Sequence, residues 1–242
     1  MDYADLWYQF IKSYRGPHKK KEPGNYIYLD ELGTMARDNK ATLIVSYEHV
    51  VGKVQEYEPL EKLVIDDPDI ARATLATACV RIIGELSPDY VETVRSNFHG
   101  EFSSISNVKE IPDISHQDVG HMIMIEGLVT EVDEKKHIYY VKRVWVCNDL
   151  HQTIRYASSE TPKKCDDEDC KIKHLRPIEA QSIKDDYVQF VVQQRPDKVR
   201  ETKAAVDVEV TVIGKDNVKF VLDELKWGDY ISVCGIVRIR EV

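Results

Sequence analysis

Apolar positions near the amino terminus repeat with a helical period. They recur at three- and four-residue steps and so line one stripe of a first helix: Leu6, Trp7, Phe10, Ile11 and Tyr14. A second short helix is expected over residues 30–38. Residues 41–46 follow, in which Leu43 and Val45 alternate with polar positions, as in a strand.

Helix start signals continue this pattern up to about residue 100. Asp67 followed by Pro68 predicts an N-cap and a first-turn proline for a long helix, and Ser87 followed by Pro88 predicts the start of a last one. The first part of the chain, residues 1–100, is therefore predicted to be a helical bundle subdomain.

From residue 102 onward, β-branched and aromatic residues separated by turn signals predict strands. The clearest expected strands are His121 to Val132, Ile138 to Val146, Tyr187 to Gln194, Val206 to Ile213 and Tyr230 to Ile239. Five strands with one long insertion are typical of a small closed barrel of the OB type. We expect no helices between these strands, which argues against a doubly wound sheet. The predicted fold class is α+β, with the OB barrel over residues 101–242.

The composition limits the cellular location and the binding partners that we expect for this chain. The 242 residues are 43% hydrophobic and 31% charged, no apolar run is long enough to cross a membrane, and the opening MDYADLWYQF does not resemble a signal peptide. We expect an intracellular protein, in the cytoplasm or associated with the nucleoid, with no membrane partner. The net charge of −9 means that any DNA-binding surface must be a local patch.

Three cysteines and one histidine are spaced like the ligands of a structural zinc site. Cys147 and His151 are separated by three residues, thirteen residues follow, and four separate Cys165 from Cys170. Four protein ligands would close the site, whereas a catalytic zinc keeps one position open for water. Unliganded thiols and a catalytic zinc remain alternatives, and His174 is an alternative to His151.

A basic segment lies between two of the expected strands. The run RPDKVRETKA places Arg195, Lys198, Arg200 and Lys203 on a connection long enough to project as a finger, which suits phosphate contacts. An ordinary solvated loop is the alternative. Neither GxxxxGK[ST] nor GxGxxG occurs, and no set of nucleophile, base and orienting residue stands out, so no enzyme activity is expected of this chain.

Several runs together resemble the N-terminal region of the MCM (minichromosome maintenance) replicative DNA helicases, and they look most like the compact archaeal form. These runs are LSPDYVETV, VGHMIMIEGLVTEV, DYVQFVVQQRP and WGDYISVCGIVR, in the order of the family. The resemblance implies a helical bundle, an OB barrel and a zinc-binding lobe inserted over residues 141–178. It also implies a homo-oligomer, a hexameric ring that could pair into a double hexamer.

In such proteins a basic hairpin from each barrel points into the ring channel and holds DNA. By position, Lys198, Arg200 and Lys203 inherit this role, with Arg195 at the start of the hairpin. Where the family usually has a lysine and an arginine on the barrel strand, this chain has His121 and Glu131, so we expect weak DNA affinity per chain. The ATPase of the family is a separate AAA+ domain, and we expect the parent chain to carry it.

Two rival functions remain at this point. The first is a free-standing single-strand DNA-binding OB protein with a zinc ribbon, for which Tyr139, Tyr140 and Trp145 would be the base-stacking residues. The second is a zinc-dependent hydrolase, which needs an open coordination position and a general base. We find no base at a suitable spacing.

Overall fold

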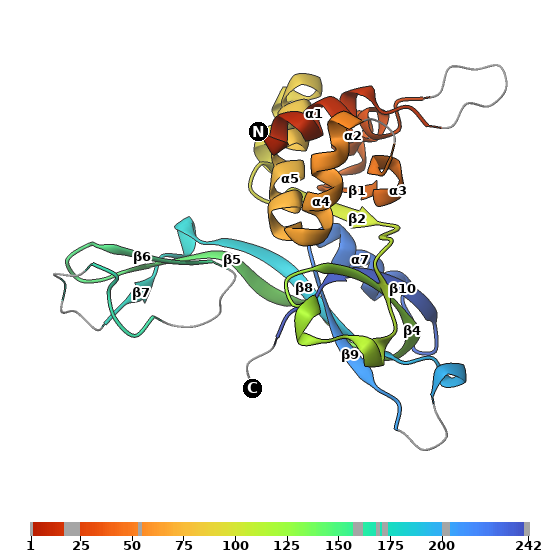
Figure 1. The fold of residues 1–242 in the computed structure, drawn as a ribbon. Coiled ribbons are helices and arrows are strands. Elements are labelled where there is room, and N and C mark those ends of the chain that lie inside the picture. The colour runs from red at the N-terminus through yellow and green to blue at the C-terminus, as the bar shows by residue number, and fades with distance from the viewer. Residues whose placement is uncertain are drawn as a thin grey trace. The chain divides into compact units, whose positions relative to one another are not determined.

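A computed structural model describes residues 2–16, 25–52, 55–156, 162–167, 170, 174–199 and 204–239 (Figure 1). The chain divides into two compact units. The first comprises Met1–Val132, Phe190–Val210 and Leu225–Val242, and the second comprises Asp133–Gln189 and Thr211–Glu224. In the described part, no helix combines the length and the apolar character that crossing a membrane requires.

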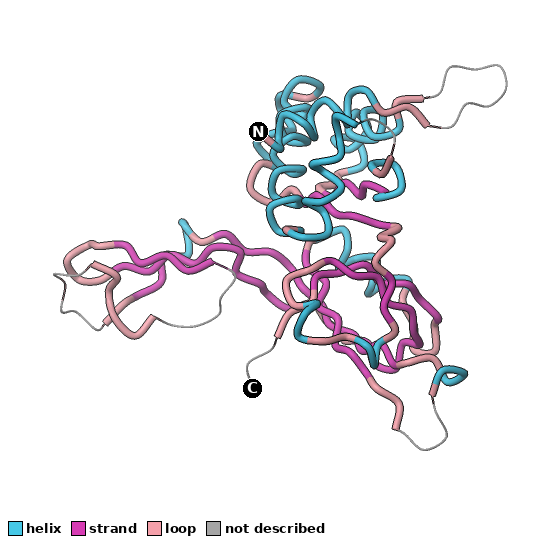
Figure 2. The backbone as a smooth tube through the Cα atoms, viewed as in Figure 1, coloured by secondary structure: helices cyan, strands magenta, loops and turns pink. Residues whose placement is uncertain are grey.

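The first unit begins with the predicted helices. They are α1 Tyr3–Ser13, α2 Ile27–Asp38, α3 Tyr47–Val50, α4 Glu58–Asp66, α5 Pro68–Leu86 and α6 Pro88–Val94. The stripe on α1 is buried as expected, with Trp7, Phe10 and Ile11 at 2% exposure or less. These side chains join the core formed with α2, α4 and α5. Figure 2 shows the backbone of these helices in cyan. The long and strongly periodic helices are confirmed, whereas α3 and α4 were not predicted.

The expected capping contacts are not made. Asp67 and Ser87 occupy the N-cap positions of α5 and α6, but neither side chain accepts a hydrogen bond from the helix. Pro68 and Pro88 do lie in the first turns, where the missing N–H group costs nothing. Helices α5 and α6 therefore start where the sequence indicates. The prolines in their first turns contribute more to these start points than the side chains at the N-cap positions do.

A two-stranded parallel sheet covers part of the helical core. Strand β1 Thr42–Ser46 pairs with β2 His99–Ser103, with Thr42 opposite His99. A Cβ atom on Gly100 would lie 2.7 Å from Cγ of Leu75. Glycine at this position therefore lets β2 approach helix α5 closely.

The remaining strands are β3 Val108–Lys109, β4 Met122–Val132, β5 His137–Val146, β6 Gln152–Tyr156, β7 Arg176–Pro177, β8 Ile183–Gln193, β9 Asp207–Ile213 and β10 Tyr230–Ile236. All five predicted strands are present. In the first unit, β4 pairs along one edge with β10, and along the other edge with β3 and then with the end of β8. In the second unit, β5 pairs with the first part of β8, with β6 and with β7.

The closed barrel that we expected is not seen among the described residues. Within the described ranges β9 pairs only with β8 and β10 only with β4, so no ladder between β9 and β10 closes the sheet. The chain is nevertheless mixed α+β, with an eight-stranded sheet in addition to the two-stranded one.

The prediction that no helix lies between the strands was wrong. Helix α7 Lys215–Glu224 connects β9 to β10, and it buries Val218 and Val221 on one face. Its start follows Gly214, whose φ of 103° is in the region that favours glycine. The three-residue step between the two valines was a helical signal, but it is short and Phe220 between them is 63% exposed.

Gly127 is needed where β4 meets β8. A Cβ atom at this position would lie 2.5 Å from the carbonyl oxygen of Gln193 and 2.5 Å from Cγ1 of Val192. No real side chain tolerates such distances, so any other residue would push the two strands apart. The connection between β8 and β9 follows Gln193 directly, and Gly127 therefore fixes the base from which it starts.

Candidate metal centre and nucleic-acid interface

Cys147 and His151 lie on one tight turn in the second unit. Strand β5 ends at Val146 and β6 begins at Gln152, which are paired, so the turn between them carries both candidate ligands. The N–H group of Cys147 donates to the carbonyl oxygen of His151 at 3.1 Å. Leu150 has a φ of 67°, a left-handed conformation that closes the turn. The turn between β5 and β6 thus brings the side chains of Cys147 and His151 close together.

Cys165 and Cys170 complete a group of four. One ligand atom from each of the four residues lies within 4.8 Å of all the others. The sulfurs of Cys147 and Cys170 are 3.8 Å apart. Two thiolates bound tetrahedrally at ~2.3 Å from one zinc ion would be about 3.8 Å apart, so this separation fits a shared metal. The group could hold a metal ion, and its three sulfurs and one imidazole are compatible with zinc.

The imidazole of His151 also fits a metal ligand. Its Nδ1 atom is buried and has no hydrogen-bond partner among the described residues. The carboxylate oxygen of Asp167 is 3.8 Å from Nδ1, beyond hydrogen-bonding distance. A buried ring nitrogen without a partner is costly, and coordination would remove that cost.

The surroundings of Cys147 favour the thiolate that a metal requires. Burial raises the pKa of this thiol, but the N–H groups of His151 and Asp149 and the neighbouring Cys170 and Cys165 lower it, and the net shift is downward. Since the thiolate is the form that binds metals, the turn prepares Cys147 for coordination.

Two side chains on β6, neither of them identified from the sequence, position the turn that carries Cys165. Thr153 is fully buried, and its Oγ1 accepts a hydrogen bond at 3.1 Å from the N–H group of Asp166. Arg155 binds both carboxylate oxygens of Asp166, at 2.7 and 2.8 Å. The hydrogen bond from Arg155 is the main reason that the pKa of Asp166 is lowered. The only signal in the sequence was a polar residue at alternate positions of a short strand.

His174, the alternative ligand, is not part of the group. The four residues that the structure brings together include His151, and the side chain of His174 is exposed. Residues 171–173, which connect it to Cys170, lie outside the described part of the chain. The geometry therefore favours His151 as the fourth ligand.

The basic connection lies in the first unit, between β8 and β9. Its base is closed by a hydrogen bond of 2.8 Å from the N–H group of Gln194 to the carbonyl oxygen of Val206. A single 3₁₀ turn, Pro196–Lys198, follows. Two of the four predicted DNA-binding residues, Arg195 and Lys198, are in this described part, and Arg200 and Lys203 lie outside the described residues.

Both described cations have carboxylate partners. Arg195 binds Asp197 at 3.1 Å and lies 3.7 Å from Glu126 on β4. Lys198 lies 3.3 Å from Glu110. All of these side chains are about half exposed, so the ion pairs are weak and a phosphate group could replace the carboxylates. Sequence reasoning missed Glu110 and Glu126 because both are far away along the chain.

The aromatic residues of the rival DNA-binding hypothesis do not form an open stacking surface. Trp145 is 4% exposed. Tyr139 makes an edge contact with Tyr187, with ring centroids 6.5 Å apart. The ring of Tyr140 is covered by the guanidinium group of Arg143, 4.3 Å away. Burial therefore closes Trp145 to base stacking, while Tyr139 and Tyr140 are half-buried and already make ring contacts within the chain.

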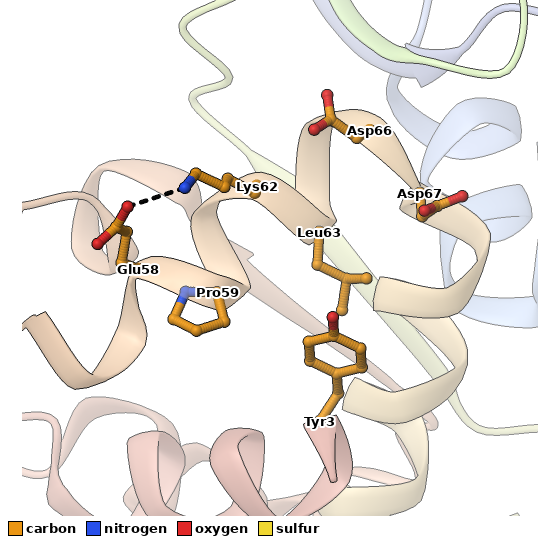
Figure 3. Close-up of a pocket in the computed structure, with 7 residues that line it drawn as sticks. All are labelled: Tyr3, Glu58, Pro59, Lys62, Leu63, Asp66 and Asp67. Atoms are coloured by element: carbon orange, nitrogen blue, oxygen red, sulfur yellow. Dashed lines mark hydrogen bonds and ion pairs between the residues drawn. The ribbon is translucent and has the colours of Figure 1, made fainter. Parts of the chain in front are cut away.

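A hollow on the helical part has no catalytic constellation. It has a volume of about 520 Å³ and is lined by Tyr3, Glu58, Pro59, Lys62, Leu63, Asp66 and Asp67 (Figure 3). Lys62 binds Glu58 at 2.9 Å, and the ring of Tyr3 points toward Leu63. This lining includes neither a histidine nor a cysteine, so it does not contribute to the metal centre.

The fold and the site together define a helical region followed by a β-rich region that carries a candidate metal centre. Both regions match family models: the MCM N-terminal domain over residues 4–113 and the MCM OB domain over residues 110–241. The chain therefore belongs to the MCM family and comprises the N-terminal region of an MCM helicase. No curated protein matches the sequence. The closer likeness to the archaeal form stays a prediction.

Proposed function

We propose that this chain is the DNA-binding and ring-assembly region of an MCM replicative helicase. The observation that carries the proposal is the match of the two family models, which together span residues 4–241. MCM domains are in general DNA-binding and oligomeric. The N-terminal and OB domains are non-catalytic, and we assign ATP hydrolysis to an AAA+ domain of the parent protein.

DNA binding is assigned to the connection between β8 and β9. The proposed phosphate contacts are Arg195, Lys198, Arg200 and Lys203. The base of this hairpin is fixed by Gly127 and by the hydrogen bond between Gln194 and Val206. Since carboxylates hold two of these cations, binding by a single chain is weak. A hexameric ring would bring six such hairpins to one channel, where linked sites gain avidity without new contacts.

A structural zinc ion is proposed to be bound by Cys147, His151, Cys165 and Cys170. With four protein ligands no coordination position remains for water, so the ion would stabilise the lobe and would not take part in a reaction. We assign residues 1–100 to the helical bundle, 101–242 to the OB module and 141–178 to the inserted zinc lobe. Contacts between such lobes would join two rings into a double hexamer.

DNA binding as a function of salt concentration tests the proposal. We expect fluorescence anisotropy with a labelled oligonucleotide to give an affinity that falls steeply as salt rises. Replacing Lys198, Arg200 and Lys203 together by alanine should abolish most of that affinity. The matched control replaces Lys62, Arg95 and Lys219, which are exposed and elsewhere on the chain, so the charge change is the same. Equal affinities of the two triple variants would refute the assignment.

A further inference from the structure

Strand β5 carries a stack of cationic and aromatic side chains that the proposed function does not use. The guanidinium carbon of Arg143 lies 4.3 Å from the ring centre of Tyr140 and 4.6 Å from that of Trp145. The ammonium nitrogen of Lys184, on β8, lies 5.4 Å from the Tyr140 ring. These contacts fix the flat guanidinium group in place, and cation–π contacts of this kind are favourable.

A β-bulge brings these side chains to one face. Residues three apart on a strand normally point to opposite faces, as Tyr140 and Arg143 would. The pairing of β5 with β8 shifts register between Tyr140 and Lys142, so β5 has one extra residue there. Tyr140 therefore shares a face with Arg143, while Lys142 next to Arg143 points to the other face.

Two buried donors in this stack have no acceptor. Nε of Arg143 and Nε1 of Trp145 are both buried and have no hydrogen-bond partner among the described residues. Trp145 itself is 4% exposed. Buried N–H groups are nearly always paired, so two unpaired donors on touching side chains point to an acceptor that binds here.

The nearby carboxylates are already engaged. Glu179 pairs with Lys184, and Asp166 holds Arg155, the residue directly opposite Arg143 across the β5–β6 pair. The pKa of Glu179 is lowered chiefly by its hydrogen bond with Lys184, with a smaller effect from the charge of Arg143. The pair with Asp166 balances the charge of Arg155, whereas no ion pair of Arg143 is seen among the described residues.

We propose that Arg143, held between Tyr140 and Trp145, binds a phosphodiester group of DNA, as a second contact separate from the hairpin. This inference rests on the proposed function, because DNA is the anion that the chain is proposed to hold. Residues 133–189 contain eleven lysines and arginines and eleven aspartates and glutamates. This segment is therefore neutral in a chain of net charge −9, and it does not repel a phosphate backbone.

The test compares Arg143→Gln with Lys142→Gln in the full chain, by anisotropy with labelled single-stranded and duplex oligonucleotides across a salt series. The two variants lose the same charge at adjacent positions on opposite faces of β5. For Arg143→Gln we expect about fivefold weaker binding and a slope of log K against log salt reduced by about one. Lys142→Gln should behave as wild type. Arg143→Lys should restore only part of the affinity, because it lacks the planar fork.

The outcomes separate this inference from the proposed function. If the wild-type chain does not bind DNA, the proposed function fails and the inference with it. If the wild type binds and Arg143→Gln leaves both affinity and salt slope unchanged, the inference alone is overturned. A labelled oligoglutamate peptide provides the other control. If it binds the wild type and not Arg143→Gln, while both proteins bind DNA equally, the site binds protein carboxylates and the inference is also overturned. Unchanged metal content and thermal unfolding show that the variants are folded.

Discussion

Glu110 pairs with Lys198 of the proposed DNA-binding hairpin, and its removal should strengthen DNA binding. Its carboxylate lies 3.3 Å from the ammonium nitrogen of Lys198, with the two side chains 48% and 50% exposed. At this distance, Coulomb attraction in bulk water amounts to about 1.3 kcal/mol, and exposed pairs of this kind contribute roughly 0.2–1 kcal/mol in practice. A phosphate that recruits Lys198 must first displace the carboxylate. Glu110→Gln should therefore raise the affinity of the chain for DNA by about threefold, or roughly 0.6 kcal/mol.

The assay is fluorescence anisotropy with a labelled oligonucleotide at low salt. Glu58→Gln is the matched control, because Glu58 is also an exposed glutamate paired with a lysine, but far from the hairpin in the chain. In the Lys198→Ala background, Glu110→Gln should lose most of its effect, since the two residues act through one ion pair. Equal gains from Glu110→Gln and Glu58→Gln would refute the reasoning, because they would show that only net charge matters.

Three further outcomes follow from particular contacts. His151→Ala should lower the zinc content measured by atomic absorption and His174→Ala should not; the reverse result would contradict the ligand assignment. Gly127→Val should lower the free energy of unfolding by at least ~2 kcal/mol, because a side chain there meets β8. Gly235→Ala, where nothing lies within 4 Å of the Cβ position, should lower it by about 1 kcal/mol or less, and similar values for both variants would contradict the close approach of β4 to β8. Burial raises the pKa of Tyr28 to about 12, so its share of the stability is complete below pH 10 and is lost as the pH rises toward 12. Chemical unfolding at pH 9 and 11 should show a smaller loss of stability in Tyr28→Phe than in wild type, because other buried groups such as Cys79 still titrate; equal losses would contradict the role of Tyr28.

Local periodicity was sufficient to predict most elements of the fold. The stripe on α1 and the proline at the start of α5 depend on neighbours within a few residues, and both helices are present. Helix α7 was missed because its buried face consists of only Val218 and Val221, which span less than one turn, and the apolar Phe220 between them is exposed. The closed barrel was expected from the number of strands and the long insertion, and neither of these gives which strands pair. Among the described residues β9 pairs with β8 and β10 pairs with β4, and these two strands do not pair with each other.

In the candidate sites too, features that depend on nearby residues could be predicted from the sequence, and contacts between distant residues could not. The spacing of the cysteines indicated the metal centre, because ligands on tight turns are close in sequence. The choice between His151 and His174 needed the turn itself, in which Cys147 and His151 are joined by a backbone hydrogen bond. The partners of the hairpin cations could not be predicted. Glu110 and Glu126 meet Lys198 and Arg195 only through the pairing of distant strands.

In the proposed assembly six copies of this chain form a ring, and the zinc-binding lobes join two such rings. Molar mass in solution, measured by light scattering with and without a strong chelator, tests it most directly. We expect about six times the 27.9 kDa of one chain, or twelve times for a double ring, and a loss of the larger species when zinc is removed. A mass of one chain at every concentration, with or without the chelator, would contradict it.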